Sequence, residues 1–230
     1  MNPQSKSIVL LSGGLDSTTS LYVARRDGRE AICLSIHYGQ LHERELEAAK
    51  KIAASLTLEH WIIPLSLPWG GSALTDARLP IPKGREETEI AKEIPVTYVP
   101  ARNSIFLSLA ASLAEVKGAD AIYFGANALD YSGYPDCRPA FLETFEALIL
   151  RGTKAGTEGR RIRIIAPLLK LTKGEIVRLG QELGVPFERT WSCYEGKESP
   201  CGECDSCILR AKGFREAGME DPLLRLAGRS

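Results

Sequence analysis

Residues 8–19, IVLLSGGLDSTT, are the stretch of this sequence that decides the fold. A short apolar run ends in a Ser-Gly-Gly turn, and Asp16 and three hydroxyl residues follow at once. Gly13 and Gly14 carry no Cβ, so the backbone can bend tightly there and approach a ligand closely. The free N–H groups at the start of a helix attract an anion. The stretch therefore predicts a strand, a phosphate-binding turn and a helix N-terminus.

This turn is not a Walker loop, because the spacing G-x-x-x-x-G-K-[ST] is absent and no lysine follows the glycines. An ordinary strand-to-helix turn rich in small residues is the alternative interpretation. The pattern S-G-G-x-D-S resembles the pyrophosphate loop of ATP pyrophosphatases, which cleave ATP between its α and β phosphates. ATP contacts are therefore expected from Leu11, Ser12, Gly13, Gly14, Leu15, Asp16, Ser17, Thr18 and Thr19.

Size and composition fit one α/β domain with a small appendage, since the chain has 230 residues. Hydrophobic residues make up 44%, which argues against disorder. The 29 basic and 29 acidic residues cancel, which leaves no electrostatic footprint for nucleic acid or an anionic membrane. No apolar run approaches the ~18 residues of a membrane span, and residues 1–7 contain no signal-peptide core. We expect a cytoplasmic protein with no nucleic-acid or membrane partner.

Strand and helix patterns alternate along the chain. Such alternation implies parallel strands joined by right-handed crossovers, with helices on both faces of the sheet. The expected fold is α/β, a parallel five-stranded sheet over residues 1–186, followed by a small C-terminal module over 187–230 that holds a cysteine cluster and a helix. The predicted strands are Ser7–Leu11, Ala31–Ile36, His60–Pro64, Ala121–Gly125 and Arg163–Ala166.

The predicted helices separate these strands, and one long segment, Leu65–Pro100, is irregular. An interruption of this length inside an α/β domain is usually a substrate or lid loop. Ligands bind beyond the carboxyl ends of the strands in such sheets, so the loops that follow the strands should converge. The predicted helices are Asp16–Arg26, Leu41–Ser55, Arg102–Lys117, Ala140–Leu150, one that begins at the capping box Thr172-Lys-Gly-Glu175 and ends before Gly184, and a short one from Ser206.

Four of the six cysteines form the pattern C-x7-C-x2-C-x2-C. Four thiolates supply a complete tetrahedral sulfur set for structural zinc, with no open position for water. An iron–sulfur cluster or a redox pair remain alternatives, although the longer ferredoxin-type run is missing. Cys33 lies in an apolar strand and is expected to be buried, whereas Cys137 has functional-looking neighbours. The expected zinc ligands are Cys193, Cys201, Cys204 and Cys207.

Charged residues near the expected phosphate loop suit phosphoryl chemistry. Lys170 and Lys173 fall where the fifth strand meets its helix, a position that suits neutralising the charge of a leaving pyrophosphate. The alternative interpretation is that they are two solvated lysines near a helix start. Asp16 suits Mg²⁺ coordination beside ATP, or it only caps the helix. The expected catalytic residues are Asp16, Ser17, Lys170 and Lys173.

The segment 126–141, ANALDYSGYPDCRPAF, combines two tyrosines, two aspartates, an amide and a guanidinium. Aromatic stacking with carboxylate hydrogen bonds holds a planar, amino-bearing heterocycle. Arg138 or Arg102 can clamp a substrate carboxylate in bidentate fashion. Alternatively, a loop with two tyrosines simply anchors itself on the core.

Five motifs appear in order: S-G-G-L-D-S-T-T, H-Y-G-Q-x-H-x-x-E, Y-V-P-A-R-N, N-A-L-D-Y-S-G-Y-P-D-C-R-P and the cysteine cluster. Together they resemble the 7-cyano-7-deazaguanine synthases, pyrophosphatase-type ATP enzymes (PP-loop superfamily) of queuosine precursor synthesis, over about residues 7–214. The resemblance implies the adenine nucleotide alpha hydrolase-like fold. It also implies substrate contacts from Arg102, Asn103, Asn127, Asp130, Tyr131, Tyr134, Asp136 and Arg138.

The resemblance further implies a ligase that forms a C–N bond. It would convert 7-carboxy-7-deazaguanine and ammonia to the nitrile through adenylated carboxylate and amide intermediates. ATP with Mg²⁺ is the implied co-substrate, and a homodimer with one structural Zn²⁺ per subunit is the implied assembly.

Two other functions fit parts of the pattern. An adenylating enzyme of the same fold that modifies tRNA would need a basic tract or an added RNA domain, which the neutral charge and short length oppose. A noncatalytic nucleotide sensor or zinc-ribbon adaptor would bind ATP without turnover. The polar segment 126–141 argues against that role, because it offers a pocket for a second small molecule.

Overall fold

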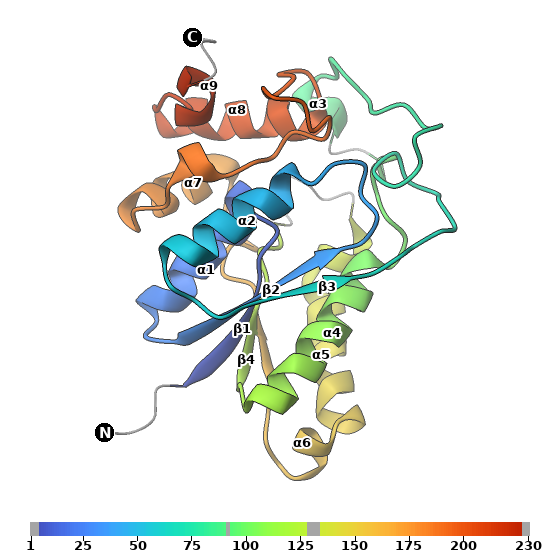
Figure 1. Cartoon of the computed structure of the whole chain (residues 1–230), viewed down its shortest axis with the longest axis vertical. Coiled ribbons are helices and arrows are strands. Elements are labelled where there is room, and N and C mark those ends of the chain that lie inside the picture. Colours follow the sequence, from blue (N-terminus) through green and yellow to red (C-terminus); the bar gives the residue numbers. More distant parts are fainter. Residues whose placement is uncertain (1–4, 91–92, 128–133, 227–230) are drawn as a thin grey trace.

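The computed structural model describes residues 5–90, 93–127 and 134–226. Its centre is a sheet of five parallel strands in the order β3-β2-β1-β4-β5 (Figure 1). The expected α/β class and five-stranded parallel sheet are thus confirmed. The chain builds outward from β1 to β3 and then returns to the other side of β1, so a topological switch point lies between β1 and β4. The strands are β1 (Lys6–Leu10), β2 (Glu30–His37), β3 (His60–Pro64), β4 (Ala121–Tyr123) and β5 (Arg163–Ile165).

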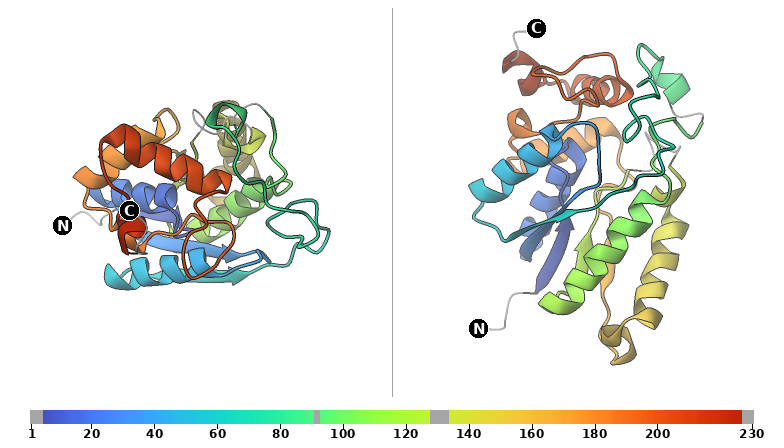
Figure 2. Two further views of the ribbon diagram at one scale, coloured as in Figure 1. Left: turned by 90° about the horizontal axis from the view of Figure 1, so that it is seen from above. Right: turned by 45° about the vertical axis from the view of Figure 1, so that its right-hand side comes forward.

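Both faces of the sheet are covered by helices, as Figure 2 shows. Successive side chains of a strand point to opposite faces. Ile8 and Leu10 therefore enter the core beneath α4 and α5, whereas Val9 enters the core beneath α1 and α2. This division explains why the strands read as continuous apolar runs. The covering helices are α1 (Leu15–Arg26), α2 (Arg44–Ser55), α4 (Arg102–Lys117) and α5 (Pro139–Gly152).

The C-terminal part of the chain packs on α7 (Lys173–Glu182) and on the start of α1 through a third apolar core. Phe214 in α8 (Asp205–Ala217) meets Phe187 edge to face, with ring centroids 5.2 Å apart. The segment that leads into the cysteine cluster also contacts the phosphate loop directly, because Trp191 N donates to Gly13 O at 2.9 Å.

A buried ion pair fixes this C-terminal part. The Arg210 guanidinium donates to both carboxylate oxygens of Asp221, at 2.6 and 2.9 Å, and also to Thr190 Oγ1 at 2.7 Å. The Arg210 and Asp221 side chains are 6% and 4% exposed. A fully paired charge of this kind holds α8, the preceding segment and the short helix α9 (Pro222–Leu226) in one arrangement.

The observed element boundaries lie close to those expected from the sequence. The capping box of α7 is present, because Thr172 Oγ1 accepts from Glu175 N while Glu175 Oε2 accepts from Thr172 N. The helix expected from Leu41 begins only at Arg44. Within the long irregular segment, the sequence did not indicate the one-turn helix α3 (Glu87–Ile90), and α6 (Lys154–Thr157) was missed in the same way. A single turn has too few residues to show a hydrophobic period.

The segment between β3 and α4 attaches to the cysteine module. Lys83 pairs with Cys204 in an isolated antiparallel bridge, and Gly84 N donates to the Glu203 carbonyl at 2.9 Å. The Arg85 guanidinium is also paired with the fully buried Asp205 carboxylate. The C-terminal module therefore holds part of the segment that the sequence left irregular.

A search of the described helices found none with enough length and apolar character to cross a bilayer.

The turn between β1 and α1 requires glycine at position 13. Gly13 has a φ of +93°, and a Cβ there would lie 2.1 Å from the Glu45 carbonyl oxygen and 2.5 Å from Ala49 N. Both atoms belong to the backbone of α2, so they cannot move aside alone. By contrast, Gly159 has a similar φ of +80° with nothing within 4 Å of its Cβ position.

We predict that Gly13→Ala destabilises the fold far more than Gly159→Ala. The positive φ costs an alanine about 1 kcal/mol at either position, and the contact with α2 adds roughly 2 kcal/mol or more at position 13. Urea unfolding followed by circular dichroism measures both free energies. Equal losses for the two variants would show that α2 does not press on the turn.

Candidate active site

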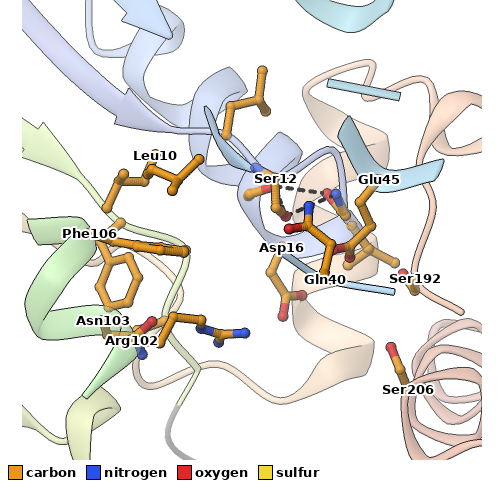
Figure 3. Close-up of a pocket in the computed structure, with 18 of the residues that line it drawn as sticks. Leu10, Ser12, Asp16, Gln40, Glu45, Arg102, Asn103, Phe106, Ser192 and Ser206 are labelled. Carbon is orange, nitrogen blue, oxygen red and sulfur yellow. Dashed lines mark hydrogen bonds between the residues drawn. The ribbon is translucent and has the colours of Figure 1, made fainter. Parts of the chain in front are cut away.

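A cavity of about 290 Å³ opens at the carboxyl ends of β1, β2 and β4. This is the edge where α/β sheets bind ligands. Its walls come from the β1–α1 turn, the starts of α2 and α4, and the C-terminal module. Figure 3 shows Ser192 and Ser206 of that module on the side away from Arg102 and Phe106.

Hydroxyl groups shape the phosphate loop. Ser17 Oγ accepts from the N–H groups of Ser12 and Gly13, both at 3.2 Å, and Ser12 Oγ accepts from Gly14 N at 3.2 Å. The first backbone bond of α1 runs from Thr18 N to Gly14 O at 3.1 Å. The amides of residues 15–17 therefore precede the helical ladder and form the anion-attracting end of α1.

Six of the nine residues expected to contact ATP line the cavity, and the other three shape the turn from behind. Thr18 Oγ1 donates to Gly14 O, and Thr19 Oγ1 donates to Leu15 O, each at 2.8 Å. The cavity-lining members are Leu11, Ser12, Gly14, Leu15, Asp16 and Ser17.

Of the two expected lysines, the structure brings only Lys173 to the cavity. Lys173 is the first residue of α7, and its ammonium pairs with Asp16 Oδ2 at 2.5 Å. The other oxygen of this carboxylate, Asp16 Oδ1, is buried and accepts no hydrogen bond from any described residue. Lys170 is exposed and does not line the cavity. The charge available for a leaving pyrophosphate is thus that of Lys173.

Of the two expected arginines, the structure brings only Arg102 to the cavity. Its guanidinium carbon lies 5.8 Å from the centroid of the Tyr38 ring and 5.9 Å from that of Phe106. Within the described ranges it pairs with no carboxylate, and its hydrogen-bond partner is Tyr38 Oη at 3.5 Å. Arg138 is exposed and precedes α5, outside the cavity lining. Arg102 is therefore the guanidinium placed to meet a substrate carboxylate.

Some residues of the polar loop before α5 line the cavity, and others support the fold. Tyr134 lines the cavity and packs against Tyr98, with ring centroids 5.7 Å apart. Asn127 also lines it, while its amide donates to Leu171 O at 2.5 Å. Asp130 and Tyr131, two of the expected substrate contacts, lie outside the described residues.

Asp136 performs a structural task in this fold. Its Oδ2 accepts from the backbone N–H of Asn103 at 3.2 Å, so the carboxylate caps the free amino end of α4. Asp136 is buried and does not line the cavity, whereas Asn103 does. Asn103 Nδ2 also donates to the sulfur of Cys137 at 3.3 Å.

Sequence reasoning assigned no role to several residues that line the cavity. Glu45 stands in the quoted motif H-x-x-E, and its carboxylate reaches the phosphate loop from α2. Burial raises the pKa of the Glu45 carboxyl to about 7, while the Arg102 charge acts in the opposite direction. The motif was the signal available for Glu45. No local signal marks Ser192 and Ser206, because only the tertiary fold brings them in.

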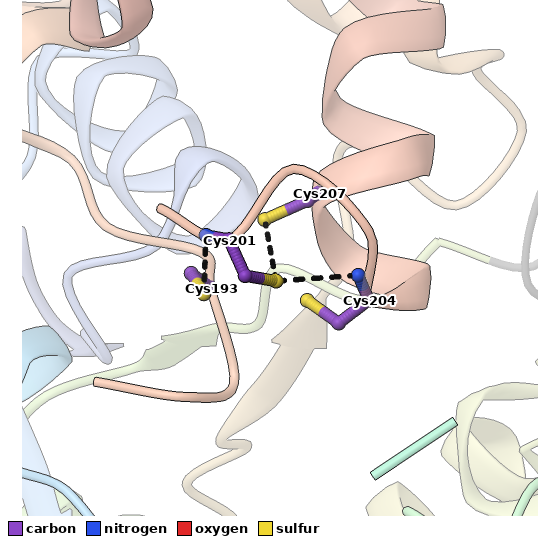
Figure 4. Close-up of side chains that lie close together, drawn as sticks. All are labelled: Cys193, Cys201, Cys204 and Cys207. Carbon is purple, nitrogen blue, oxygen red and sulfur yellow. Dashed lines mark hydrogen bonds between the residues drawn. The ribbon is translucent and has the colours of Figure 1, made fainter. Parts of the chain in front are cut away.

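The four clustered cysteines meet as the spacing predicts (Figure 4). All four sulfur atoms lie within 4.8 Å of one another, and Cys201 Sγ is 4.0 Å from Cys207 Sγ. Tetrahedral zinc with Zn–S bonds near 2.3 Å needs S···S separations of about 3.8 Å. Backbone N–H groups of residues 201 and 204 donate to the sulfurs of Cys193 and Cys201, each at 3.3 Å. The donor set therefore fits a metal ion held by thiolates.

The two remaining cysteines are ordinary buried thiols. Burial raises the pKa of Cys33 and of Cys137 to about 12 in each case, so neither is a thiolate near neutral pH. Cys137 lines the cavity but does not have the thiolate character of a nucleophile.

Comparison with known proteins gives a consistent result. A family model described as "Queuosine biosynthesis protein QueC" matches residues 6–218. A protein of Anaeromyxobacter sp. (strain Fw109-5) named 7-cyano-7-deazaguanine synthase is 57% identical, over 96% of this chain and 97% of its own length. A protein of the same name from Trichodesmium erythraeum (strain IMS101) is 53% identical, over 95% of this chain and 100% of its own length.

Among solved structures, a 4-thiouridine synthetase in complex with RNA and bound ATP superposes with a TM-score of 0.51. It is 23% identical and covers 97% of this chain and 49% of that chain, a likeness that shows the fold alone. The resemblance stated from the sequence motifs is confirmed by the family match and the relatives. The chain is an enzyme that belongs to the QueC family of queuosine biosynthesis proteins, whose curated relatives are named 7-cyano-7-deazaguanine synthase.

Proposed function

We propose that this enzyme converts 7-carboxy-7-deazaguanine and ammonia to 7-cyano-7-deazaguanine with ATP, through adenylated intermediates. One observation carries the proposal: the anion-attracting start of α1 and the Arg102 guanidinium face a single cavity. A triphosphate and a carboxylate substrate can thus meet there. The names of the curated relatives support the same product.

The chemistry explains why ATP is needed. A carboxylate does not react with ammonia, because oxide is too poor a leaving group. Attack of a carboxylate oxygen on the α-phosphorus of ATP releases pyrophosphate and leaves an acyl adenylate. Ammonia then displaces AMP to give the amide. A second adenylation, on the amide oxygen, allows elimination to the nitrile.

The residues of the cavity suit these steps without a covalent enzyme intermediate. The amides of residues 15–17 and the Lys173 ammonium would stabilise charge on the departing pyrophosphate. Arg102 would orient the carboxylate toward the α-phosphorus, which turns the reaction into a positioned attack. The heterocycle of the substrate would bind in the part of the cavity lined by Tyr134, Asn127 and Asn103.

Magnesium is the expected companion of ATP, and Asp16 would hold it. The buried Oδ1 atom of Asp16 accepts no hydrogen bond in the described chain, which fits a metal-ligating oxygen beside phosphates. Mg²⁺ would neutralise phosphate charge during transfer.

We also propose that the cysteine cluster holds one structural zinc ion per subunit. We further propose that the protein is a homodimer located in the cytoplasm. We also propose that the chain divides into an ATP pyrophosphatase domain over residues 1–186 and a C-terminal module over residues 187–230. Light scattering on the purified chain would measure the oligomeric state.

The tRNA-modifying alternative is less consistent with the site. A thiolation mechanism needs a reactive thiol near the phosphate loop, and the cavity-lining Cys137 has a raised pKa. A noncatalytic nucleotide sensor would release no pyrophosphate. Release that depends on added deazaguanine carboxylate would separate the enzyme from both alternatives.

We predict that Arg102→Ala lowers kcat/KM for the carboxylate substrate by about 100-fold, or ~2.7 kcal/mol of transition-state stabilisation. Arg138→Ala should change it by no more than about twofold, because that side chain is exposed outside the cavity. A coupled pyrophosphate assay measures both variants. The reverse order of effects would assign the carboxylate to Arg138.

We predict about one zinc and no iron per chain by atomic emission, as expected for a closed four-thiolate site. Cys204→Ser should lose the zinc and most carboxylate-dependent pyrophosphate release, because the module forms one wall of the cavity. Iron with visible absorption, in protein purified without air, would instead indicate an iron–sulfur cluster.

A further inference from the structure

Glu45 reaches the reaction cavity from the first turn of α2. Its carbonyl oxygen packs against the position where Gly13 lacks a Cβ, and its Oε1 lies 3.3 Å from the Cβ position of Gly14. The carboxylate is therefore held beside the loop that would bind phosphates, and Figure 3 shows it near Ser12 and Gln40. The packing of α2 on the phosphate loop fixes the backbone of Glu45 beside the turn.

Two carboxylates line the cavity in the described part of the chain, and they differ in their partners. The Asp16 carboxylate is paired with the Lys173 ammonium. The Glu45 carboxylate forms no ion pair or hydrogen bond with the described residues, and the charges that influence it are Arg102, Asp16 and Cys193. Glu45 is thus the carboxylate of the cavity that remains available to a proton.

Burial gives this carboxylate the proton affinity that a base needs. Desolvation raises the pKa of Glu45 to about 7, and the negative charge of Asp16 contributes in the same direction. A general base works best when its pKa lies near the operating pH. His42 also lines the cavity and carries a ring nitrogen that can accept a proton, but burial lowers its pKa and its ring packs against Gly196 of the cysteine module.

We propose that Glu45 is the general base that removes the proton from the attacking ammonia nitrogen. This role rests on the proposed function, which supplies the acyl adenylate. The nitrogen forms a bond to the acyl carbon, the bond from that carbon to the AMP oxygen breaks, and AMP leaves as an anion. One proton passes from the nitrogen to the Glu45 carboxylate, which leaves a neutral amide. Glu45 then releases the proton to water.

Three reactions of Glu45→Gln test this role, since glutamine keeps the size of the side chain and removes its basicity. The first is carboxylate-dependent exchange of labelled pyrophosphate into ATP, which reports adenylation alone. The second is amide formation from ammonia. The third is hydroxamate formation from hydroxylamine, which is uncharged at neutral pH and gives a more acidic nitrogen after attack.

We expect Glu45→Gln to keep exchange within about threefold and to lose at least about 100-fold with ammonia, the usual range for a general base. Hydroxylamine should restore acyl transfer to within about tenfold of the unaltered chain, because it needs less help from a base. Glu47→Gln is the matched control. Glu47 lies on the same helix, is exposed, and its pairing with Arg44 at 4.0 Å contributes little.

Other outcomes would overturn the assignment. If Glu45→Gln lost equal activity with ammonia and with hydroxylamine, Glu45 would act in adenylation or magnesium binding. The same conclusion would follow if the variant lost pyrophosphate exchange together with ammonia-dependent turnover. Unchanged ammonia turnover would remove Glu45 from the mechanism. Absence of exchange in both the unaltered chain and the Glu47→Gln control would instead contradict the proposed function itself.

Discussion

The site depends on the close approach of two backbone segments, the β1–α1 turn and the first turn of α2. Only a glycine at position 13 allows it, because the α2 backbone occupies the space of a Cβ. The approach places the start of α1, residues 15–17, at the cavity and brings Glu45 alongside the turn. The anion-binding end of one helix and a carboxylate of the next are thus fixed by a single contact.

The C-terminal module continues this contact on the other side of the turn. Trp191 N donates to Gly13 O at 2.9 Å, and the chain then runs into the cysteine cluster and α8. The buried pair of Arg210 and Asp221 holds α8 in place, while the cluster holds the segment that carries Ser192. A metal ion bound by the four thiolates would therefore stabilise a wall of the cavity although it lies outside the reaction.

The charges of the cavity are arranged by role. Lys173 is paired with Asp16 at the amino end of α1, where phosphate charge would develop. Arg102 lies beside two aromatic rings that contact each other, and it has no carboxylate partner among the described residues, so it is available to an anionic substrate. The Glu45 carboxylate is half-buried and has no ion-pair partner among the described residues, and this burial raises its pKa. Three charged groups in one cavity thus have three different environments, and each environment suits a different step.

The sequence by itself determined the order of the elements, the phosphate turn, the cysteine cluster and the family. Each of these depends on local patterns: strand and helix periodicity, the glycines of a turn, or four cysteines within fifteen residues of one another. Tertiary structure decided which side chains reach the cavity. Lys173 reaches the cavity and pairs with Asp16. Lys170, three residues earlier in the chain, is exposed instead. The tertiary structure also made Asp136 the cap of α4 and brought Glu45 to the phosphate loop. Sequence spacing could not show this, because contacts between residues of different elements depend on how the helices pack across the sheet.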